Sequence, residues 1–129
     1  MHLEAIRAFI SSTVKYSLVL SGILILSSEL LLVQQSESPL ALLDLIRDMR
    51  AEMGKAGFQS FKTLPFPQPC YPTGWWSVTV ASKQAGFGFG FRQEDSVNKP
   101  FETLYYTAPL HTGVLVSPPF VAKALARKI

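Results

Sequence analysis

The sequence has few of the residues that build disulfide-stapled or metal-bound domains. Its 129 residues include one cysteine, Cys70, and two histidines. One thiol cannot close an internal disulfide, which argues against a stapled secreted fold and fits the reducing cytoplasm. Histidine and cysteine side chains this far apart in sequence give no metal-ligand spacing. We therefore expect a cytoplasmic protein without a metal, in which Cys70 is a small buried residue.

Charge is also scarce. Asp, Glu, Lys and Arg make up 16% of the chain, below the roughly 25% of an average soluble domain. The apolar share of 48% is enough for a core, and the net charge is only +3. A nucleic-acid-binding protein would gather its basic residues on one face or helix. Because these basic residues are scattered among carboxylates, we expect no nucleic-acid partner.

The longest apolar run lies near the N-terminus, at Leu18–Val33. A membrane span needs about 20 apolar residues, whereas this run is shorter and contains Glu29. A signal peptide would need a small-x-small cleavage site before Gln34, and none is present. Parallel strands buried on both faces also read as continuous apolar runs. We favour one or two buried parallel strands here and keep a membrane-associated segment as the alternative.

The clearest helix signal follows Ser38, which can cap a helix whose first turn contains Pro39. Gly54 and Gly57 can supply a left-handed stop. The helix has a stripe of apolar residues at helical spacing and charged residues off the stripe that should face water. The stripe consists of Leu42, Leu45, Ile46, Met49 and Met53, and the charged residues are Asp44, Arg47, Asp48 and Arg50.

Two strands are predicted after this helix. The first covers Phe58–Leu64 and should end at the prolines 65, 67 and 69, because proline cannot donate to a sheet ladder. A turn at Tyr71–Gly74 then leads to Trp75–Ser82, whose side chains alternate between two faces. Strand, helix and strand in this order are typical of an α/β layer.

The last third of the chain gives weaker signals. Ala85–Phe91 reads AGFGFGF, which lacks the spacing and context of a dinucleotide fingerprint and predicts an irregular extended segment with three rings pointing one way. The polar stretch 93–100 should be exposed. The TGVLV sequence at 112–116 favours a strand, and Pro118 and Pro119 begin a last short helix through Ala126.

Several of these segments occur together in one known family. Gly22–Leu24 with Val33–Pro39 (GIL, then VQQSESP) and Pro69–Trp75 (PCYPTGW) resemble two segments of the polyamine aminopropyltransferases, G-x-L-x-Q-x-E-S-P and P-T-Y-P-x-G-x-W. Three further segments follow the family pattern in the same order. They are the helix LLDLIRDMR with Ala56–Phe58, the strand end Val80–Lys83, and a C-terminal set of Tyr105, Tyr106, Thr107, His111, Pro119 and Phe120.

The resemblance covers residues 22–125 and implies the C-terminal part of a catalytic domain over 22–129, with residues 1–21 unmatched. The implied fold is α/β, a partial Rossmann-like methyltransferase fold that contributes its last strands and helices, with an antiparallel C-terminal strand pair. The implied reaction is that of a spermidine synthase, in which putrescine takes an aminopropyl group from decarboxylated S-adenosylmethionine.

The resemblance also implies roles for individual residues. Gln35 and Tyr71 match positions that line the amine-acceptor pocket, and Glu37 is a further acceptor or an anion at a helix N-terminus. We expect Trp75 and Trp76 to pack in the core and at the edge of the sheet, with shaping of the pocket as the alternative. Tyr105, Tyr106 and His111 would form a buried hydrogen-bonded cluster, because buried phenols and imidazoles need partners.

The sequence also departs from the family, because the Gly-rich donor loop and paired aspartates that precede the matched region are missing. We therefore expect no catalytic residue, no bound cofactor or donor, and a truncated chain that is inactive alone. Putrescine or a related polyamine is the expected ligand, with a second copy or a complementing chain as a possible partner. The alternative is a non-catalytic α/β remnant that binds a membrane or another protein.

Overall fold

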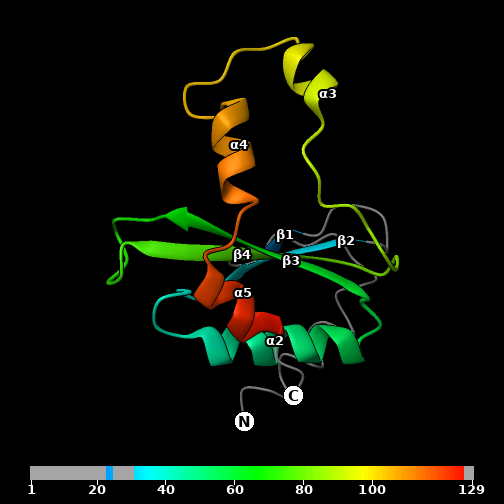
Figure 1. The fold of residues 1–129 in the computed structure, drawn as a ribbon, viewed down its shortest axis with the longest axis vertical. Helices are drawn as coiled ribbons and strands as arrows, with labels where there is room; N and C mark the ends of the chain where they lie inside the picture. Colours follow the sequence, from blue (N-terminus) through cyan, green and yellow to red (C-terminus); the bar gives the residue numbers. More distant parts are fainter. Residues whose placement is uncertain (1–22, 25–30, 127–129) are drawn as a thin grey trace.

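The computed structural model describes residues 23–24 and 31–126, and these residues form a layered α/β unit (Figure 1). Its four-stranded sheet has the order β1-β2-β4-β3. Helix α2 lies across one face of the sheet with α5 beside it, while α3 and α4 extend from the other side. The strands are β1 (Ile23–Leu24), β2 (Leu31–Ser36), β3 (Ser60–Pro67) and β4 (Trp75–Ser82), and the helices are α2 (Leu43–Lys55), α3 (Gln93–Val97), α4 (Ala108–Val114) and α5 (Pro119–Ala126).

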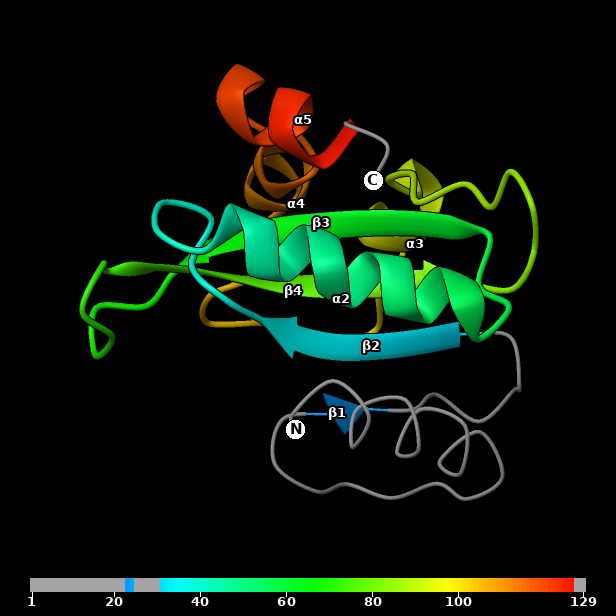
Figure 2. The same cartoon turned by 90° about the horizontal axis from the view of Figure 1, so that it is seen from below.

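The strand directions define the topology. β4 pairs antiparallel with β2 on one side and with β3 on the other, so β2 and β3 run in the same direction (Figure 2). Helix α2 is the crossover that connects them, and the returning strand β4 fills the gap between them. The predicted antiparallel C-terminal strand pair is therefore confirmed as β3 and β4.

The predicted parallel strand at Leu18–Val33 is only partly covered, because most of that segment lies outside the described residues. Its last residues, Leu31–Val33, belong to β2. Both described neighbours of β2 run antiparallel to it, so the expected parallel pairing is wrong for this strand. Among residues 23–24 and 31–126, no helix is long and apolar enough to cross a membrane.

The hydrophobic core lies between α2 and the sheet. Met53 of α2 packs with Leu32 of β2, Ala81 of β4 and Phe58, and each of these side chains is at most 6% exposed. Met49 and Phe61 pack against this cluster and are partly buried. Gly57 ends the helix with a φ of 95°, a left-handed conformation that glycine adopts without a Cβ penalty. The left-handed stop predicted there is confirmed.

The start of this helix differs from the prediction. Ser38 and Pro39 are buried in a turn that precedes α2, and the N-cap is Leu42, which makes no side-chain capping bond. The Ser38 carbonyl accepts from the Leu42 N–H at 2.9 Å, and its Oγ accepts from the Leu40 N–H at 3.3 Å. Ser38 therefore stabilises the turn through local hydrogen bonds and does not cap the helix.

The predicted apolar stripe is correct only in its second half. Ile46 and Met53 are buried, whereas Leu42, the N-cap, and Leu45, inside the helix, are each 43% exposed. Arg50 was expected to face water, but its guanidinium lies 5.4 Å from the centre of the Phe61 ring. Burial lowers the pKa of Arg50 below its ordinary value. The long side chain covers apolar surface while it retains its charge.

Strand β3 continues past the residue where it was predicted to stop. Pro65 and Pro67 lie inside the strand, opposite Ser77 and Trp75 of β4. Within the described residues, β3 is an edge strand, and the two prolines are two positions apart. Their nitrogens therefore point the same way, away from β4, where a missing N–H removes no bond of the ladder.

The segment after β4 forms an arm, residues 87–114, made of the irregular stretch 87–92, α3, the loop that follows it and α4 (Figure 1). The strand predicted at 112–116 is wrong, because Thr112, Gly113 and Val114 belong to α4. Thr107 begins this helix, and its side chain accepts from the Leu110 N–H at 3.3 Å. A side-chain cap with Pro109 in the first turn outweighs the β preference of a short apolar run. The last helix, α5, is confirmed.

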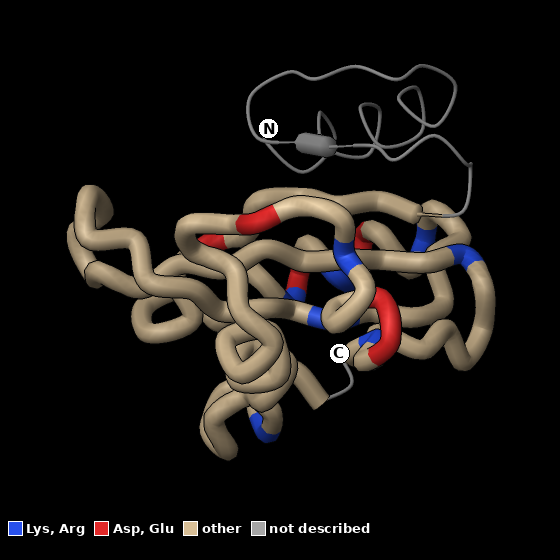
Figure 3. Tube along the Cα trace, turned by 90° about the horizontal axis from the view of Figure 1, so that it is seen from above, with Lys and Arg blue, Asp and Glu red and all other residues tan. Residues whose placement is uncertain are grey.

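Charged residues of both signs are spread over the helices, strands and arm (Figure 3). Helix α2 illustrates this mixing, because Arg47 pairs with Asp44 at 3.0 Å and Lys55 pairs with the buried Glu52 at 2.7 Å. Each pair has the i,i+3 spacing at which side chains meet on a helix surface.

A line of buried hydroxyl groups crosses three strands on the face of the sheet that packs against α2. Thr63 Oγ1 lies 2.9 Å from Thr79 Oγ1, which lies 3.0 Å from Ser36 Oγ, and Ser36 Oγ lies 2.9 Å from Ser77 Oγ. Ser77 donates its one hydroxyl proton to the Glu37 carbonyl at 2.7 Å. Since each hydroxyl has a single proton, every other bond must run the same way, from Thr63 to Thr79, Ser36, Ser77 and finally Glu37.

Met53 is buried and Leu45 is largely exposed on the same helix, so truncating them should affect stability very differently. Met53→Ala should lower the free energy of unfolding by about 2–5 kcal/mol, because it leaves a cavity in the packed core. Leu45→Ala, on the exposed side of the same helix, should cost less than about 1 kcal/mol. Urea unfolding monitored by circular dichroism measures both, and equal losses would contradict the described core.

The hydroxyl line predicts that its central member matters most. Thr79→Val keeps the shape of the side chain but leaves Thr63 without its acceptor and Ser36 without its donor. We expect a loss of about 1–3 kcal/mol in the free energy of unfolding, as for an unsatisfied buried polar group. Thr112→Val, on the exposed α4, is the matched control and should cost less than about 0.5 kcal/mol beyond any change in helix propensity. The same urea titration measures both variants. An unchanged free energy of unfolding for Thr79→Val would contradict a connected line of hydrogen bonds.

Candidate functional site

Two of the predicted site residues meet at one end of the sheet. Gln35 lies near the end of β2, and Tyr71 lies in the turn between β3 and β4. The Gln35 Nε2 atom donates to the Tyr71 hydroxyl at 3.3 Å. They meet because β2 and β4 are neighbours, so the turn that precedes β4 lies beside the end of β2. The sequence separation of 36 residues is thus closed by the sheet register.

The register also decides which glutamine faces the turn. Gln35 is opposite Val78 and Gln34 is opposite Thr79, so the two adjacent amides point to opposite faces of the sheet. Gln34 therefore shares the α2 face with the hydroxyl line, and its Oε1 is buried without a hydrogen-bond partner in the part of the chain that the structure describes. A one-residue slip of β2 would exchange the two side chains.

The Tyr71 side chain is fixed from two directions. Its backbone N–H donates to Gln68 at 3.1 Å, and its carbonyl accepts from the Gly74 N–H at 2.8 Å. Gly74 has a φ of 66°, so glycine suits this tight turn. The phenol ring lies 4.4 Å from the Trp76 ring, centre to centre, at a tilt of 59°. Turn geometry and ring contact together direct the hydroxyl toward Gln35.

The two tryptophans take different positions. The Trp76 ring contacts the Tyr71 ring. Trp76 Nε1 is buried without a hydrogen-bond partner among the described residues. Trp75 is opposite Pro67 at the start of β4, on the other face of the strand, and is half-buried. Trp76 is thus the tryptophan that supports the Gln35 and Tyr71 pair.

Glu37 lies directly after β2 but not at a helix N-terminus. Helix α2 begins at Leu43, so the predicted stabilisation of Glu37 by a helix dipole is wrong. Its backbone is instead held by the hydroxyl line, because the Glu37 carbonyl accepts the final bond from Ser77. The line therefore positions the chain immediately after Gln35. Sequence reasoning missed this support, although Ser77 and Thr79 alternate with larger side chains along β4.

The predicted cluster of Tyr105, Tyr106 and His111 is only partly present. The Tyr106 hydroxyl and His111 Nδ1 are 2.9 Å apart, and the two side chains are half-buried. Tyr105 is 69% exposed and lies outside the pair, because the loop before α4 turns only one of the adjacent phenols inward. Cys70 was predicted to be buried but is exposed, in the turn beside Tyr71.

The polar groups of this end can bind an amine. When the Gln35 amide nitrogen donates to Tyr71, Oε1 of the same amide remains an acceptor. The Tyr71 oxygen and the Glu37 carboxylate can accept further N–H groups. Gln35 is exposed and Tyr71 is half-buried, so a ligand can reach them. An alkylammonium ion, which has only donors, suits this set of acceptors.

The order and directions of the strands define the class of fold. Two strands of one direction, joined by a helix and separated by a reversed strand, form the end of a Rossmann-like methyltransferase sheet. A spermidine synthase from Thermotoga maritima matches with a TM-score of 0.61 and 25% sequence identity, over 74% of this chain and 33% of that one. A spermidine synthase in complex with the transition state analogue AdoDATO matches over the same shares, with a TM-score of 0.59 and 25% identity. The predicted partial methyltransferase-like fold is confirmed.

Several curated proteins are similar to this chain in sequence. A polyamine aminopropyltransferase from Xanthomonas euvesicatoria pv. vesicatoria is 80% identical over 100 residues, which are 78% of this chain and 35% of the relative. The corresponding proteins of Xanthomonas campestris pv. campestris and Xanthomonas oryzae pv. oryzae are 82% and 83% identical over 95 residues. No protein-family model matches the chain.

These identities confirm the resemblance seen in the sequence: the matched part of the chain is homologous to part of the polyamine aminopropyltransferases. The chain spans about one third of the length of the curated relatives it matches.

The geometry at Tyr71 separates two contributions of its side chain. Tyr71→Phe keeps the ring on Trp76 and loses only the exposed bond to Gln35, so the free energy of unfolding should fall by less than about 1 kcal/mol. Tyr71→Ala also removes the ring contact and should cost about 1 kcal/mol or more beyond that. Near-ultraviolet circular dichroism should change for Tyr71→Ala and stay close to that of the parent chain for Tyr71→Phe. Identical spectra for both variants would contradict the contact with Trp76.

Proposed function

We propose that this chain carries the amine-acceptor wall of an aminopropyltransferase site, with Gln35, Glu37 and Tyr71 as its binding residues. The observation that supports this proposal most is the contact between Gln35 and Tyr71, two residues far apart in sequence. Their position also fits, because open α/β sheets bind their ligands beyond the carboxyl ends of strands, which is where β2 ends.

The ligand is putrescine or a closely related polyamine. One ammonium group is bound by the amide oxygen of Gln35 and the phenol oxygen of Tyr71, and Glu37 offsets positive charge nearby. In the reaction, an uncharged amine nitrogen attacks the aminopropyl carbon beside the sulfonium of decarboxylated S-adenosylmethionine. The carbon–sulfur bond breaks, sulfur takes its electron pair, and the products are spermidine, methylthioadenosine and a proton.

Turnover needs more than this wall. The attacking amine has to lose a proton, and efficient transfer needs a positioned base. Among the described residues, Glu37 is the carboxylate nearest in sequence to Gln35. Its backbone is fixed by the hydroxyl line, and its proposed role is to offset positive charge. We propose that the base and the donor site come from a part of the enzyme that this sequence does not contain. On this basis the chain alone binds amines without forming spermidine.

The working environment proposed for the chain is the cytoplasm. Cys70 is exposed and unpaired, which suits a compartment that keeps thiols reduced. A complementing chain that supplies the base and the donor site would be the partner that completes the site.

The test is a titration of the full chain with putrescine, monitored by isothermal titration calorimetry. We expect weak binding, at roughly millimolar concentration for so small a ligand. Gln35→Leu should weaken it about tenfold, because a hydrogen bond to a charged donor is lost. The control is Gln93→Leu, which changes an exposed glutamine of α3 and should leave the affinity unchanged.

Two outcomes would contradict different parts of the proposal. Equal affinity of the parent chain and Gln35→Leu would remove the amine site from this end of the sheet. Spermidine formation by the purified chain alone, with decarboxylated S-adenosylmethionine and putrescine supplied, would show that the chain needs no further part. A mass-spectrometric assay for spermidine distinguishes this second outcome from the first.

A further inference from the structure

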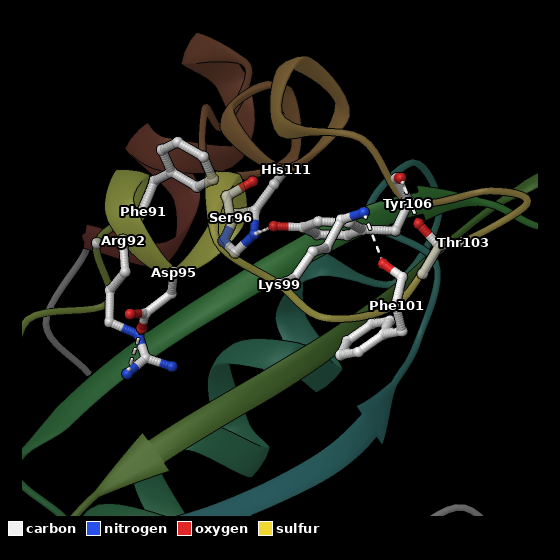
Figure 4. A pocket seen from close by; sticks show the side chains of 10 residues that line it. Phe91, Arg92, Asp95, Ser96, Lys99, Phe101, Thr103, Tyr106 and His111 are labelled. Atoms are coloured by element: carbon white, nitrogen blue, oxygen red, sulfur yellow. Dashed lines mark hydrogen bonds and ion pairs between the residues drawn. The ribbon is translucent and has the colours of Figure 1, made fainter.

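The arm contains a pocket that the amine site does not use. Its cavity of about 350 Å³ lies between α3, α4 and the loop that connects them (Figure 4). Small-molecule sites range from about 300 to 1,000 Å³, so this pocket has room for a ligand of one ring. The lining residues are Gly90, Phe91, Arg92, Asp95, Ser96, Lys99, Phe101, Thr103, Tyr106 and His111.

One wall of the pocket is a set of aromatic rings in fixed contact. The His111 ring lies 5.0 Å from the Phe91 ring, at an interplanar angle of 65°, and 5.6 Å from the Tyr106 ring, at 77°. The hydrogen bond between Tyr106 and His111 holds the last two rings together. Rings arranged edge to face leave faces and edges available to a further ring, so this wall favours a flat aromatic ligand.

The charges of the pocket favour an anion. Arg92 is paired with Asp95 at 2.8 Å, and Asp95 is the only carboxylate among the lining residues. The Lys99 ammonium donates to the Phe101 carbonyl at 3.1 Å, which occupies one of its three protons. Within the part of the chain that the structure describes, no carboxylate pairs with Lys99. The lining therefore has a net positive charge and would repel a diammonium ligand.

We infer that this pocket binds a small aromatic carboxylate. The carboxylate accepts from the Lys99 ammonium, and the ring packs against Tyr106, His111 and Phe101. Lys99 lies 5.9 Å from the centre of the Phe101 ring, so charge and ring are presented side by side. The site is separate from the Gln35 and Tyr71 pair, and its occupancy does not depend on amine binding there.

The experiment is an NMR titration of the full, uniformly ¹⁵N-labelled chain with three probes of the same shape: benzoate, benzamide and benzylamine. Benzoate should shift the amide signals of residues 90–111 and saturate at roughly millimolar concentration. Uncharged benzamide should bind about fivefold to tenfold more weakly, because it loses the charge-assisted bond to Lys99. Benzylamine should leave the arm signals unchanged.

Lys99→Gln should reduce the benzoate affinity to that of benzamide. Lys123→Gln, which removes an exposed lysine of α5 outside the arm, should leave it unchanged. Unperturbed signals outside the arm confirm that each variant is folded. Equal benzoate affinity in the parent chain and Lys99→Gln, or no shift at residues 90–111 with benzoate, would overturn the site.

Discussion

The line of hydroxyl groups from Thr63 to Glu37 is the constraint on which the structure depends most. It joins three strands beneath α2 through bonds that can run in one direction only. Hydrogen bonds in such a chain polarise and strengthen one another in a low-dielectric interior. Because its last acceptor is the backbone immediately after Gln35, the same bonds that hold the sheet together also fix the candidate site.

The hydroxyl line and the strand pairing fix the backbone of the candidate site, although its side chains are accessible. Gln35 projects from a strand that is paired along its length with β4, and Tyr71 is held by a tight turn and by the Trp76 ring. The acceptors are thus positioned before a ligand arrives, which reduces the entropy lost on binding. The arm differs, since its aromatic pocket is built from loops and short helices away from the sheet.

Much of this could be predicted from the sequence, and the failures have physical reasons. The strand Trp75–Ser82 and the helix Pro119–Ala126 follow from local pattern, and the family motifs indicated that Gln35 and Tyr71 line the same pocket. The late start of α2 did not follow from the sequence, because Ser38 stabilises a turn as readily as a helix. The helical state of 112–114 depends on the Thr107 cap, which outweighs propensity, and the exposures of Tyr105 and Cys70 depend on loop paths that no periodicity encodes.

The two prolines of β3 have a consequence for solubility. An unpaired strand edge presents N–H and C=O groups to other molecules and is a common starting point for aggregation. Pro65 and Pro67 lack the N–H groups that would otherwise point outward from β3. A strand of another molecule therefore finds no hydrogen-bond donor at these two positions. In a chain that spans only a third of its relatives' length, the two prolines therefore disfavour pairing between β3 and a strand edge of another molecule.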